Sequence, residues 1–212
     1  KVPILCGGTG LYVDSLVYGI DYPEIEFDQG YRDELMAVAD YEDGLERLYE
    51  MAMKIDPDAV LKISRNDKKR ITRVLELYRA TGKTKTELER ESRKNGVKYD
   101  YRIFAIGMDR EKLYDRINKR VDLMIEQGLV DEVKDIVKKY DKFPTAMQGL
   151  GYKEVVEYFD KKLTMDEMIQ KIKQETRRYA KRQLTWFRKN KSIVWIDGLD
   201  DREKNLEIII ND

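Results

Sequence analysis

The 212-residue sequence contains no histidine and only one cysteine. These absences exclude a His-dependent catalytic triad and a zinc site built from histidine and cysteine. Cys6 has no second cysteine for an internal disulfide, which suits a reducing compartment, and we expect a cytoplasmic protein. Any catalysis by this chain must therefore rest on carboxylates, hydroxyls, lysine, arginine, backbone amides or a metal ion carried by a phosphate.

Long apolar runs are also absent. No stretch approaches the ~20 residues needed to cross a bilayer, so we expect no membrane partner. Charged residues make up 39% of the chain and hydrophobic residues 42%, which is typical of a soluble, helix-rich protein with a proper core. The 41 Lys+Arg balance the 41 Asp+Glu, so any local excess of one sign is informative.

Positive charge is concentrated in one segment. Between Lys171 and Lys191 there are nine basic residues and one acidic residue. Helical spacing places the following residues on one face: Arg178, Lys181, Arg182, Thr185 and Arg188. A polyanion partner requires such a concentration of charge. The alternative is that Trp186 and Phe187 belong to the core and that the cations are merely exposed.

Strand-like sequences flank a purely helical block. Val2–Cys6, Tyr101–Gly107 and Ser192–Asp197 are apolar runs with β-branched or aromatic residues. Residues 28–96 carry helical periodicity instead, with breaks at residues 56–57, 66–67 and 81–82. We therefore predict an α/β fold in which a parallel-sheet core, residues 1–27 and 97–212, is interrupted by an all-helical insertion, residues 28–96.

The second part of the core is expected to be mostly helical. The pattern predicts four helices, which are Leu113–Gln127, Val130–Tyr140, Tyr152–Phe159 and Met165–Arg188.

The turn Gly7-Gly-Thr-Gly offers backbone N–H groups and a hydroxyl at the start of a helix, which suits an anion or a nucleotide. The alternative is a purely structural turn. It is not a Walker A loop, because no Lys-Ser/Thr follows at the required spacing.

Two further clusters of cations could contact phosphates. Lys69, Arg70 and Arg73 project together from one predicted helix, and a solvated face is the alternative. Arg116 and Arg120 lie four residues apart, a spacing that could clamp a diphosphate. For this helix the alternative is pairing of charges within the helix.

A glycine-rich elbow precedes the helix that begins at Tyr152. Gln148, Tyr152 and Lys153 could read a base edge, stack on the base and hold its phosphate. The alternative is a turn that needs glycine for a positive φ.

Four motifs in this order resemble the tRNA dimethylallyltransferases, also called tRNA isopentenyltransferases. They are Gly7–Tyr12, Asn66–Arg73, Gln148–Lys153 and Lys181–Arg188, and the last is the most specific. The resemblance covers essentially the whole chain. It implies transfer of a dimethylallyl group from dimethylallyl diphosphate to N6 of the adenosine 3′ of the tRNA anticodon.

The resemblance also implies the architecture and the partners. The core would be of the P-loop NTPase type, and the helical insertion would grip the anticodon stem-loop. Mg²⁺ would be bound through the diphosphate, with no metal site made by protein ligands, and the full-length protein would be a monomer.

Individual residues follow from the matched motifs. Thr9 would lie near the target adenosine, and Arg32 would contact tRNA. The other implied tRNA-binding residues are Lys69, Arg70, Ile71, Thr72, Arg73, Gln148, Gly149, Leu150, Gly151, Tyr152, Lys153, Lys181, Arg182, Gln183, Leu184, Thr185, Trp186, Phe187 and Arg188. Arg116 and Arg120 are our own candidates for the diphosphate.

The sequence departs from the family in one respect. The family's P-loop, and the Asp that acts as general base on the N6 amine, have no counterpart in these residues. We therefore expect an incomplete core that binds tRNA but is inactive alone. A non-catalytic tRNA-binding module from a truncated gene is the alternative. A nucleotide-kinase relative is a third reading, although such a kinase would not need the segment Lys181–Arg188.

Overall fold

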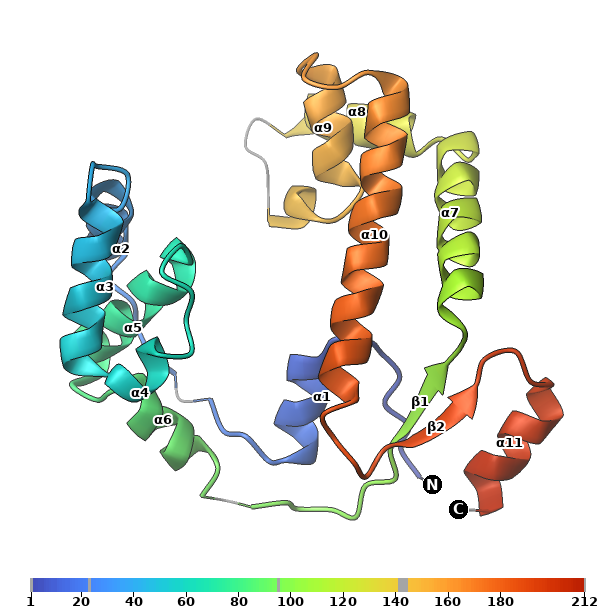
Figure 1. Ribbon diagram of the computed structural model, residues 1–212, viewed down its shortest axis with the longest axis horizontal. Coiled ribbons are helices and arrows are strands. Elements are labelled where there is room, and N and C mark those ends of the chain that lie inside the picture. Colours follow the sequence, from blue (N-terminus) through green and yellow to red (C-terminus); the bar gives the residue numbers. More distant parts are fainter. Residues whose placement is uncertain (1, 23, 95, 141–144, 212) are drawn as a thin grey trace. The chain divides into compact units, whose positions relative to one another are not determined.

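The computed structural model describes residues 2–22, 24–94, 96–140 and 145–211 (Figure 1). The chain divides into two compact units. Unit 1 comprises Lys1–Gly10 and Arg102–Asp212, and unit 2 comprises Leu11–Tyr101. The boundaries of the compact units along the chain therefore lie between residues 10 and 11 and between residues 101 and 102. The domain boundaries predicted from the sequence lie between residues 27 and 28 and between residues 96 and 97.

Unit 1 contains a two-stranded parallel sheet. β1 (Phe104–Gly107) pairs with β2 (Val194–Asp197), and the register aligns Phe104 with Val194 and Gly107 with Asp197. Parallel strands need a long crossover connection, and here the chain between them forms helices. Two of the three strands predicted from the sequence are confirmed, although both are shorter than their apolar runs.

The prediction of a strand at Val2–Cys6 is wrong. The structure assigns no strand to these residues, and the side chains of Val2, Ile4 and Leu5 are 88%, 90% and 61% exposed. An apolar run forms a strand only where a neighbouring strand supplies hydrogen-bond partners. Among the described residues, β1 and β2 pair only with each other.

The helices of unit 1 form its hydrophobic core. They are α7 (Arg110–Glu126), α8 (Leu129–Lys139), α9 (Tyr152–Phe159) and α10 (Met165–Phe187), so all four predicted helices are confirmed within a few residues. The buried residues are Val121, Leu129, Val133, Met147, Val155, Met168 and Ile172. A short 3₁₀ helix, η1 (Thr145–Gln148), precedes α9, and α11 (Arg202–Asn211) follows β2.

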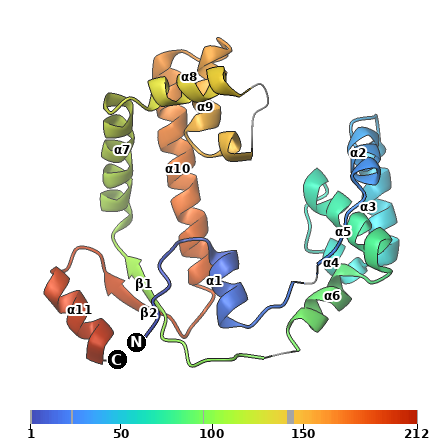
Figure 2. The same cartoon turned by 180° about the vertical axis from the view of Figure 1, so that it is seen from behind.

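α10 is the longest described helix and lies beside α7 (Figures 1 and 2). Thr164 caps its first turn, because the Thr164 hydroxyl accepts the N–H of Glu167 while the Glu167 carboxylate accepts the N–H of Thr164. Arg177 donates a hydrogen bond of 2.6 Å to Asn118, and Lys173 Nζ lies 2.6 Å from Asp122. These polar contacts fasten α10 to α7.

Helices are the regular secondary structure of unit 2 among its described residues. Its helices are α1 (Gly10–Val17), α2 (Gln29–Val38), α3 (Gly44–Ile55), α4 (Pro57–Val60), α5 (Lys68–Thr81) and α6 (Lys85–Ser92), with Gly10 of α1 counted in unit 1. The predicted helix breaks at residues 56–57, 66–67 and 81–82 are confirmed. The core comprises Leu35, Leu48, Tyr49, Ala52, Val60, Ile63, Ile71, Val74 and Leu75.

A buried carboxylate joins two helix starts in unit 2. Asp56 is 3% exposed and caps α4 by accepting the N–H of Ala59 at 3.0 Å. It also accepts the backbone N–H of Thr86 at 2.8 Å and the Thr86 hydroxyl at 2.7 Å. Burial alone would raise the pKa of Asp56, but these hydrogen bonds outweigh it and lower the pKa.

No described helix is long and apolar enough to cross a membrane.

Candidate nucleic-acid interface

The glycine-rich turn lies against the C-terminal part of α10 within unit 1. Gln183 Nε2 donates a hydrogen bond of 2.8 Å to the carbonyl oxygen of Gly8. A Cβ on Gly8 would lie 2.1 Å from Gln183 Nε2, and one on Gly10 would lie 2.2 Å from Cδ1 of the Trp186 ring. Gly10 is therefore needed for close approach to the Trp186 ring, whereas at Gly8 the end of the flexible Gln183 side chain would have to move. Thr9, which is exposed, is held between them beside α10.

The cationic face of α10 is exposed. Lys181, Arg182, Thr185 and Arg188 all face solvent, as their spacing predicts. Arg182 lies 5.8 Å from the centroid of the Tyr179 ring. Within the described part of the chain, no carboxylate partner is recorded for Lys181, Arg182 or Arg188. Cations without counter-ions on one face suit a backbone of phosphates.

Trp186 and Phe187 do not belong to the core of unit 1. The core cluster contains neither residue, and Trp186 is 39% exposed. Trp186 instead packs on Gly10, and Phe187 is half-buried. The alternative in which these two rings are core residues is therefore not supported.

Carboxylates hold the elbow at residues 148–153. Glu154 is fully buried and accepts the backbone N–H of Gly151 at 2.7 Å, while Lys153 Nζ lies 3.3 Å from its other oxygen. Gly151 has φ +98°, a value that favours glycine. The Tyr152 hydroxyl donates to Glu132 of α8, and this hydrogen bond raises the pKa of Tyr152.

Most of this elbow is exposed. Gln148, Gly149, Leu150 and Lys153 face solvent, whereas Gly151 is buried. The glycine needed for a positive φ and the polar residues that could read a base therefore coexist in one segment.

Arg116 and Arg120 are both exposed on α7. They lie on the side of the helix away from Asn118 and Asp122, which contact α10. Lys119 and Asp115 form the expected ion pair within the helix, with 2.8 Å between Nζ and Oδ2. No carboxylate partner is recorded for Arg116 or Arg120 in the described ranges, so both guanidinium groups are free to bind an anion.

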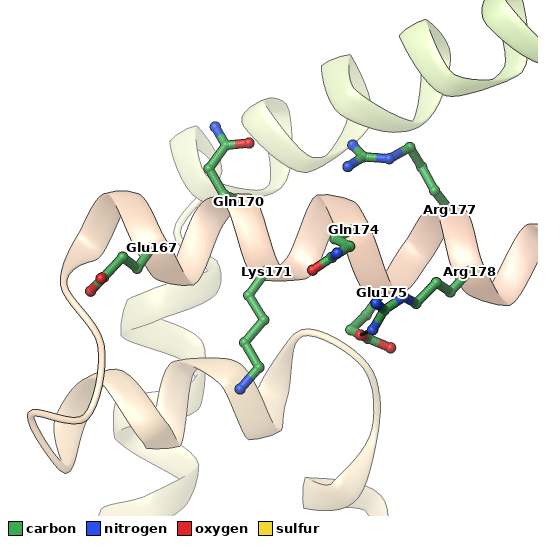
Figure 3. A pocket seen from close by; sticks show the side chains of 7 residues that line it. All are labelled: Glu167, Gln170, Lys171, Gln174, Glu175, Arg177 and Arg178. Carbon is green, nitrogen blue, oxygen red and sulfur yellow. Dashed lines mark hydrogen bonds and ion pairs between the residues drawn. The ribbon is translucent and has the colours of Figure 1, made fainter.

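A shallow hollow runs along the first half of α10, and Figure 3 shows its lining side chains. They are Glu167, Gln170, Lys171, Gln174, Glu175, Arg177 and Arg178. Its cations already have partners, because Lys171 pairs with Glu157 and Arg178 pairs with Glu175. Of the residues that helical spacing places on the cationic face, Arg178 alone lines the hollow, and it is paired with Glu175, so we do not assign the interface to this hollow.

The segment Asn66–Arg73 supplies cations in unit 2. Lys69 and Arg70 are exposed near the start of α5, and Arg73 is 42% exposed. Ile71 and Thr72 are buried, and the Thr72 hydroxyl donates to the carbonyl of Lys68 at 3.0 Å. The exposed positive charge of this segment therefore comes from three of its residues.

Arg32 and Arg73 share one buried carboxylate. Glu76 is 5% exposed and accepts two hydrogen bonds from Arg32, at 2.7 Å from Nε and 2.8 Å from Nη2. Arg73 Nη1 lies 3.4 Å from the same carboxylate, and its guanidinium stacks 3.9 Å from the centroid of Phe27. The hydrogen bond from Arg32 lowers the pKa of Glu76 and raises that of Arg32.

Sequence reasoning missed Glu76 and the contact between Gln183 and Gly8. Glu76 could have been found, because it is a carboxylate among the apolar residues Val74, Leu75 and Leu77 and lies one helical turn after Arg73. A charge at such a position needs a partner. The contact with Gly8 left no local signal, since it joins residues 175 positions apart.

No metal cage is formed by the protein side chains that the structure describes. No group of three or more Asp, Glu, His or Cys residues gathers within that part of the chain.

Comparison with known proteins identifies close similarities. The family described as IPP transferase matches residues 1–190. The tRNA dimethylallyltransferase of Acetivibrio thermocellus is 48% identical over 207 residues, and that of Carboxydothermus hydrogenoformans is 46% identical over 213 residues. These alignments cover 96% and 100% of this chain but 66% and 68% of the two relatives, so the chain spans about two thirds of their length.

Solved structures are also similar. The tRNA isopentenylpyrophosphate transferase of Bacillus halodurans matches with a TM-score of 0.60 and 37% identity, covering 96% of this chain and 62% of that one. A eukaryotic dimethylallyltransferase studied while acting on tRNA matches with a TM-score of 0.72 and 28% identity, covering 97% of this chain and 55% of that one. The α/β fold with a small parallel sheet and many helices is thus shared with these structures.

Proposed function

The chain belongs to the IPP transferase family, and from that premise we propose that it supplies the tRNA-binding surface of a tRNA dimethylallyltransferase. The reaction would transfer a dimethylallyl group from dimethylallyl diphosphate to N6 of the adenosine 3′ of the anticodon. N6 attacks the dimethylallyl carbon, the carbon–oxygen bond to the diphosphate breaks, and N6 gives up a proton to a base.

The observation that carries this proposal is the contact between the glycine turn and α10. Gln183 and Trp186 hold Gly8 and Gly10, which flank Thr9, against the same part of α10 that carries Lys181 and Arg182, so we propose that the target base and the RNA backbone both bind near this end of the helix. Reaching N6 requires the base to leave its stack. Phosphate contacts and stacking offset that cost.

We propose supporting roles for the other cations. Arg116 and Arg120 bind the diphosphate, whose negative charge grows as the carbon–oxygen bond breaks. Arg32, Lys69 and Arg73 bind the anticodon stem-loop, as part of a helical insertion in a core of the P-loop type. Mg²⁺ would arrive with the diphosphate, because the described side chains do not form a cage for it.

We propose that residues 1–212 alone bind tRNA without transferring the prenyl group. They contain no Gly-x-x-x-x-Gly-Lys-Ser/Thr sequence, and the matched motifs provide no general base for N6. A non-catalytic tRNA-binding module is the second candidate, and the same two features favour it. Both candidates predict RNA binding, and they differ only in whether a P-loop segment completes the catalytic site.

One experiment tests the proposal with this polypeptide. An anticodon stem-loop RNA and labelled dimethylallyl diphosphate are incubated with residues 1–212, and binding and prenyl transfer are measured separately. We expect binding, and transfer no greater than in a control without enzyme. Transfer above that control contradicts the proposed inactivity, and failure to bind RNA contradicts the proposed surface. Binding of mononucleotides without RNA would favour the nucleotide-kinase reading.

Two double variants, each of which removes two positive charges, refine the test. Lys181→Ala with Arg182→Ala should weaken RNA binding and reduce its salt dependence by about one unit per lost phosphate contact. The matched control is Lys134→Ala with Lys138→Ala, which removes two exposed lysines of α8. Equal effects of the two double variants would contradict a specific role for α10.

A further inference from the structure

We infer that Glu76 is a positioning residue for RNA binding: its buried carboxylate orders Arg32 and Arg73 as a two-arginine site for a phosphate of the RNA backbone. This inference rests on the proposed function, because it takes RNA as the ligand. It assigns a role to an acidic residue, whereas none of the residues implied by the motifs is acidic.

The geometry places the two guanidinium groups close together. Glu76 Oε2 accepts from Arg32 Nη2 at 2.8 Å and lies 3.4 Å from Arg73 Nη1. Both guanidinium groups also lie near one ring, 5.9 Å and 3.9 Å from the centroid of Phe27. Two side chains from different helices, α2 and α5, are thus fixed by one carboxylate and one aromatic ring.

The cluster keeps donors free for a ligand. Arg32 uses Nε and Nη2 on Glu76, and Arg73 uses Nη1. Within the described part of the chain, no hydrogen bond is recorded for Nη1 of Arg32 or for the other nitrogens of the Arg73 guanidinium group. The two arginine side chains are 40% and 42% exposed, whereas Glu76 is buried beneath them. The planar guanidinium group binds phosphate through paired N–H groups, so the exposed edges suit one phosphate.

The charge balance argues against a purely structural role. A single carboxylate neutralises one arginine, so a pair would suffice to join α2 to α5. The second arginine leaves an excess positive charge, and two like charges held close together repel each other. A buried ion pair is also weak evidence for stability. Asp33 is a second carboxylate near Arg32, and its charge also raises the pKa of Arg32. Asp33 is exposed and accepts a hydrogen bond from Gln29.

Holding the arginines in advance lowers the entropic cost of binding. A free arginine side chain loses rotamer freedom when it is ordered on a ligand. In this cluster, Glu76 and Phe27 have ordered the side chains before RNA arrives. The neighbouring cations Lys69 and Arg70 are exposed on the same helix and extend the positive surface.

The variant Glu76→Gln separates positioning from simple electrostatics. Removing a negative charge from a surface that binds a polyanion should, by charge alone, raise RNA affinity. Positioning predicts the opposite, because the neutral amide presents an N–H₂ group and holds two guanidinium groups poorly. We expect the Kd of the 212-residue chain for the anticodon stem-loop to rise about tenfold.

The matched control is Glu46→Gln. Glu46 also pairs with an arginine, Arg65, in unit 2, but this pair is exposed and contacts none of the cluster residues. By charge alone, this variant should leave RNA affinity unchanged or slightly higher. Circular dichroism and thermal melts verify that each variant is folded at the temperature of the binding assay.

Two further variants keep the inference testable if Glu76→Gln does not fold. Arg32→Lys and Arg73→Lys preserve charge but lose the guanidinium fork, and each should weaken RNA binding several-fold. Glu76→Gln added to the double variant Arg32→Ala, Arg73→Ala should weaken RNA binding no further, because Glu76 acts through these two arginines. If the role of Glu76 were only structural, adding Glu76→Gln would instead weaken RNA binding further.

The outcomes distinguish this inference from the proposed function. If the unaltered chain fails to bind the stem-loop, the proposed function is wrong. If it binds, and folded Glu76→Gln binds equally well or more tightly, the positioning role is wrong. Unchanged affinity in both lysine variants also overturns the two-arginine site. Titration with inorganic phosphate should show far weaker binding than RNA, whereas equal affinity would identify a free-phosphate site instead.

Discussion

In unit 2, two partly exposed arginines share the buried carboxylate of Glu76. In unit 1, no carboxylate partner is recorded among the described residues for Lys181, Arg182 and Arg188 at the C-terminal end of α10. Unit 1 fixes this part of α10 differently. The side chains of Gln183 and Trp186 pack on the backbone of Gly8 and Gly10. One unit thus orders its positive surface by charge pairing, and the other orders it by close backbone contact.

This difference determines what each surface tolerates. Charge pairing depends on the ionisation of buried carboxylates, so unit 2 should be sensitive to acid. Close backbone contact depends on the absence of a Cβ, so the surface of unit 1 should be sensitive to small increases in side-chain size. Each unit also has a separate core, which allows the two sensitivities to be measured independently.

The largest effects should come from truncating the two cores. Ile71 in unit 2 and Ile172 in unit 1 are both fully buried, and replacing either by Ala should cost about 2 to 5 kcal/mol. Calorimetry of the 212-residue chain should show two unfolding transitions, with each variant lowering one of them. A single transition that both variants lower equally would mean that the units unfold together.

The next effect concerns the glycine turn. Gly10→Ala places a Cβ 2.2 Å from Trp186 Cδ1, so the ring must move and the cations of α10 move with it. We expect about a tenfold loss of RNA affinity, equivalent to about 1.4 kcal/mol.

Gly7→Ala is the control for this turn, because a Cβ at Gly7 meets nothing within 4 Å. It should leave RNA affinity unchanged. An equal loss in both variants would show that the turn needs glycine for flexibility rather than for contact with α10.

The sequence predicted local features better than contacts between distant residues. Helix ends in unit 2 were predictable because Asp67 and Gly82 are strong helix-boundary residues, and they do cap α5. The strand at Val2–Cys6 was predicted wrongly, since its apolar pattern says nothing about whether a partner strand lies beside it. The pairing of Arg32 with Glu76 spans 44 residues, and a spacing argument reaches only along one helix.

In the candidate site, too, the features that depend on local spacing were the predictable ones. Exposure of Lys181, Arg182 and Arg188 followed from helical spacing. The burial of Ile71 follows from its place on the apolar side of α5 with Val74 and Leu75, but a motif treats every residue in its range alike. Helical periodicity therefore separates the exposed from the buried residues within each motif.

Acid should affect unit 2 more than unit 1. Hydrogen bonds from Arg32 lower the pKa of Glu76, and those from Thr86 and Ala59 overcome burial to lower the pKa of Asp56. A carboxyl with a lowered folded-state pKa contributes full stability above its unfolded pKa, about 4. That contribution is lost as the pH falls through the folded pKa.

Melting curves between pH 7 and pH 3 test this expectation. The transition lowered by Ile71→Ala should fall more steeply below about pH 4 than the transition lowered by Ile172→Ala. In Glu76→Gln the steepness should decrease, because one of the two buried carboxyls no longer titrates. Parallel acid dependence of the two transitions would contradict the greater role of buried carboxylates in unit 2.

The smallest effects should come from the same capping motif in each unit. Thr84 begins α6 and Thr164 begins α10, and each hydroxyl accepts the N–H of a glutamate three residues later. Thr164→Ala should cost roughly 1 kcal/mol, because α10 contributes Met168 and Ile172 to the core and its start cannot loosen independently. Thr84→Ala should lower the unfolding transition less, since α6 has no fully buried residue and can fray before unit 2 unfolds.

Serine at either position keeps the hydroxyl and should restore most of the loss. Equal shifts for the two alanine variants would show that α6 unfolds together with its unit, held by the hydrogen bonds between Thr86 and Asp56.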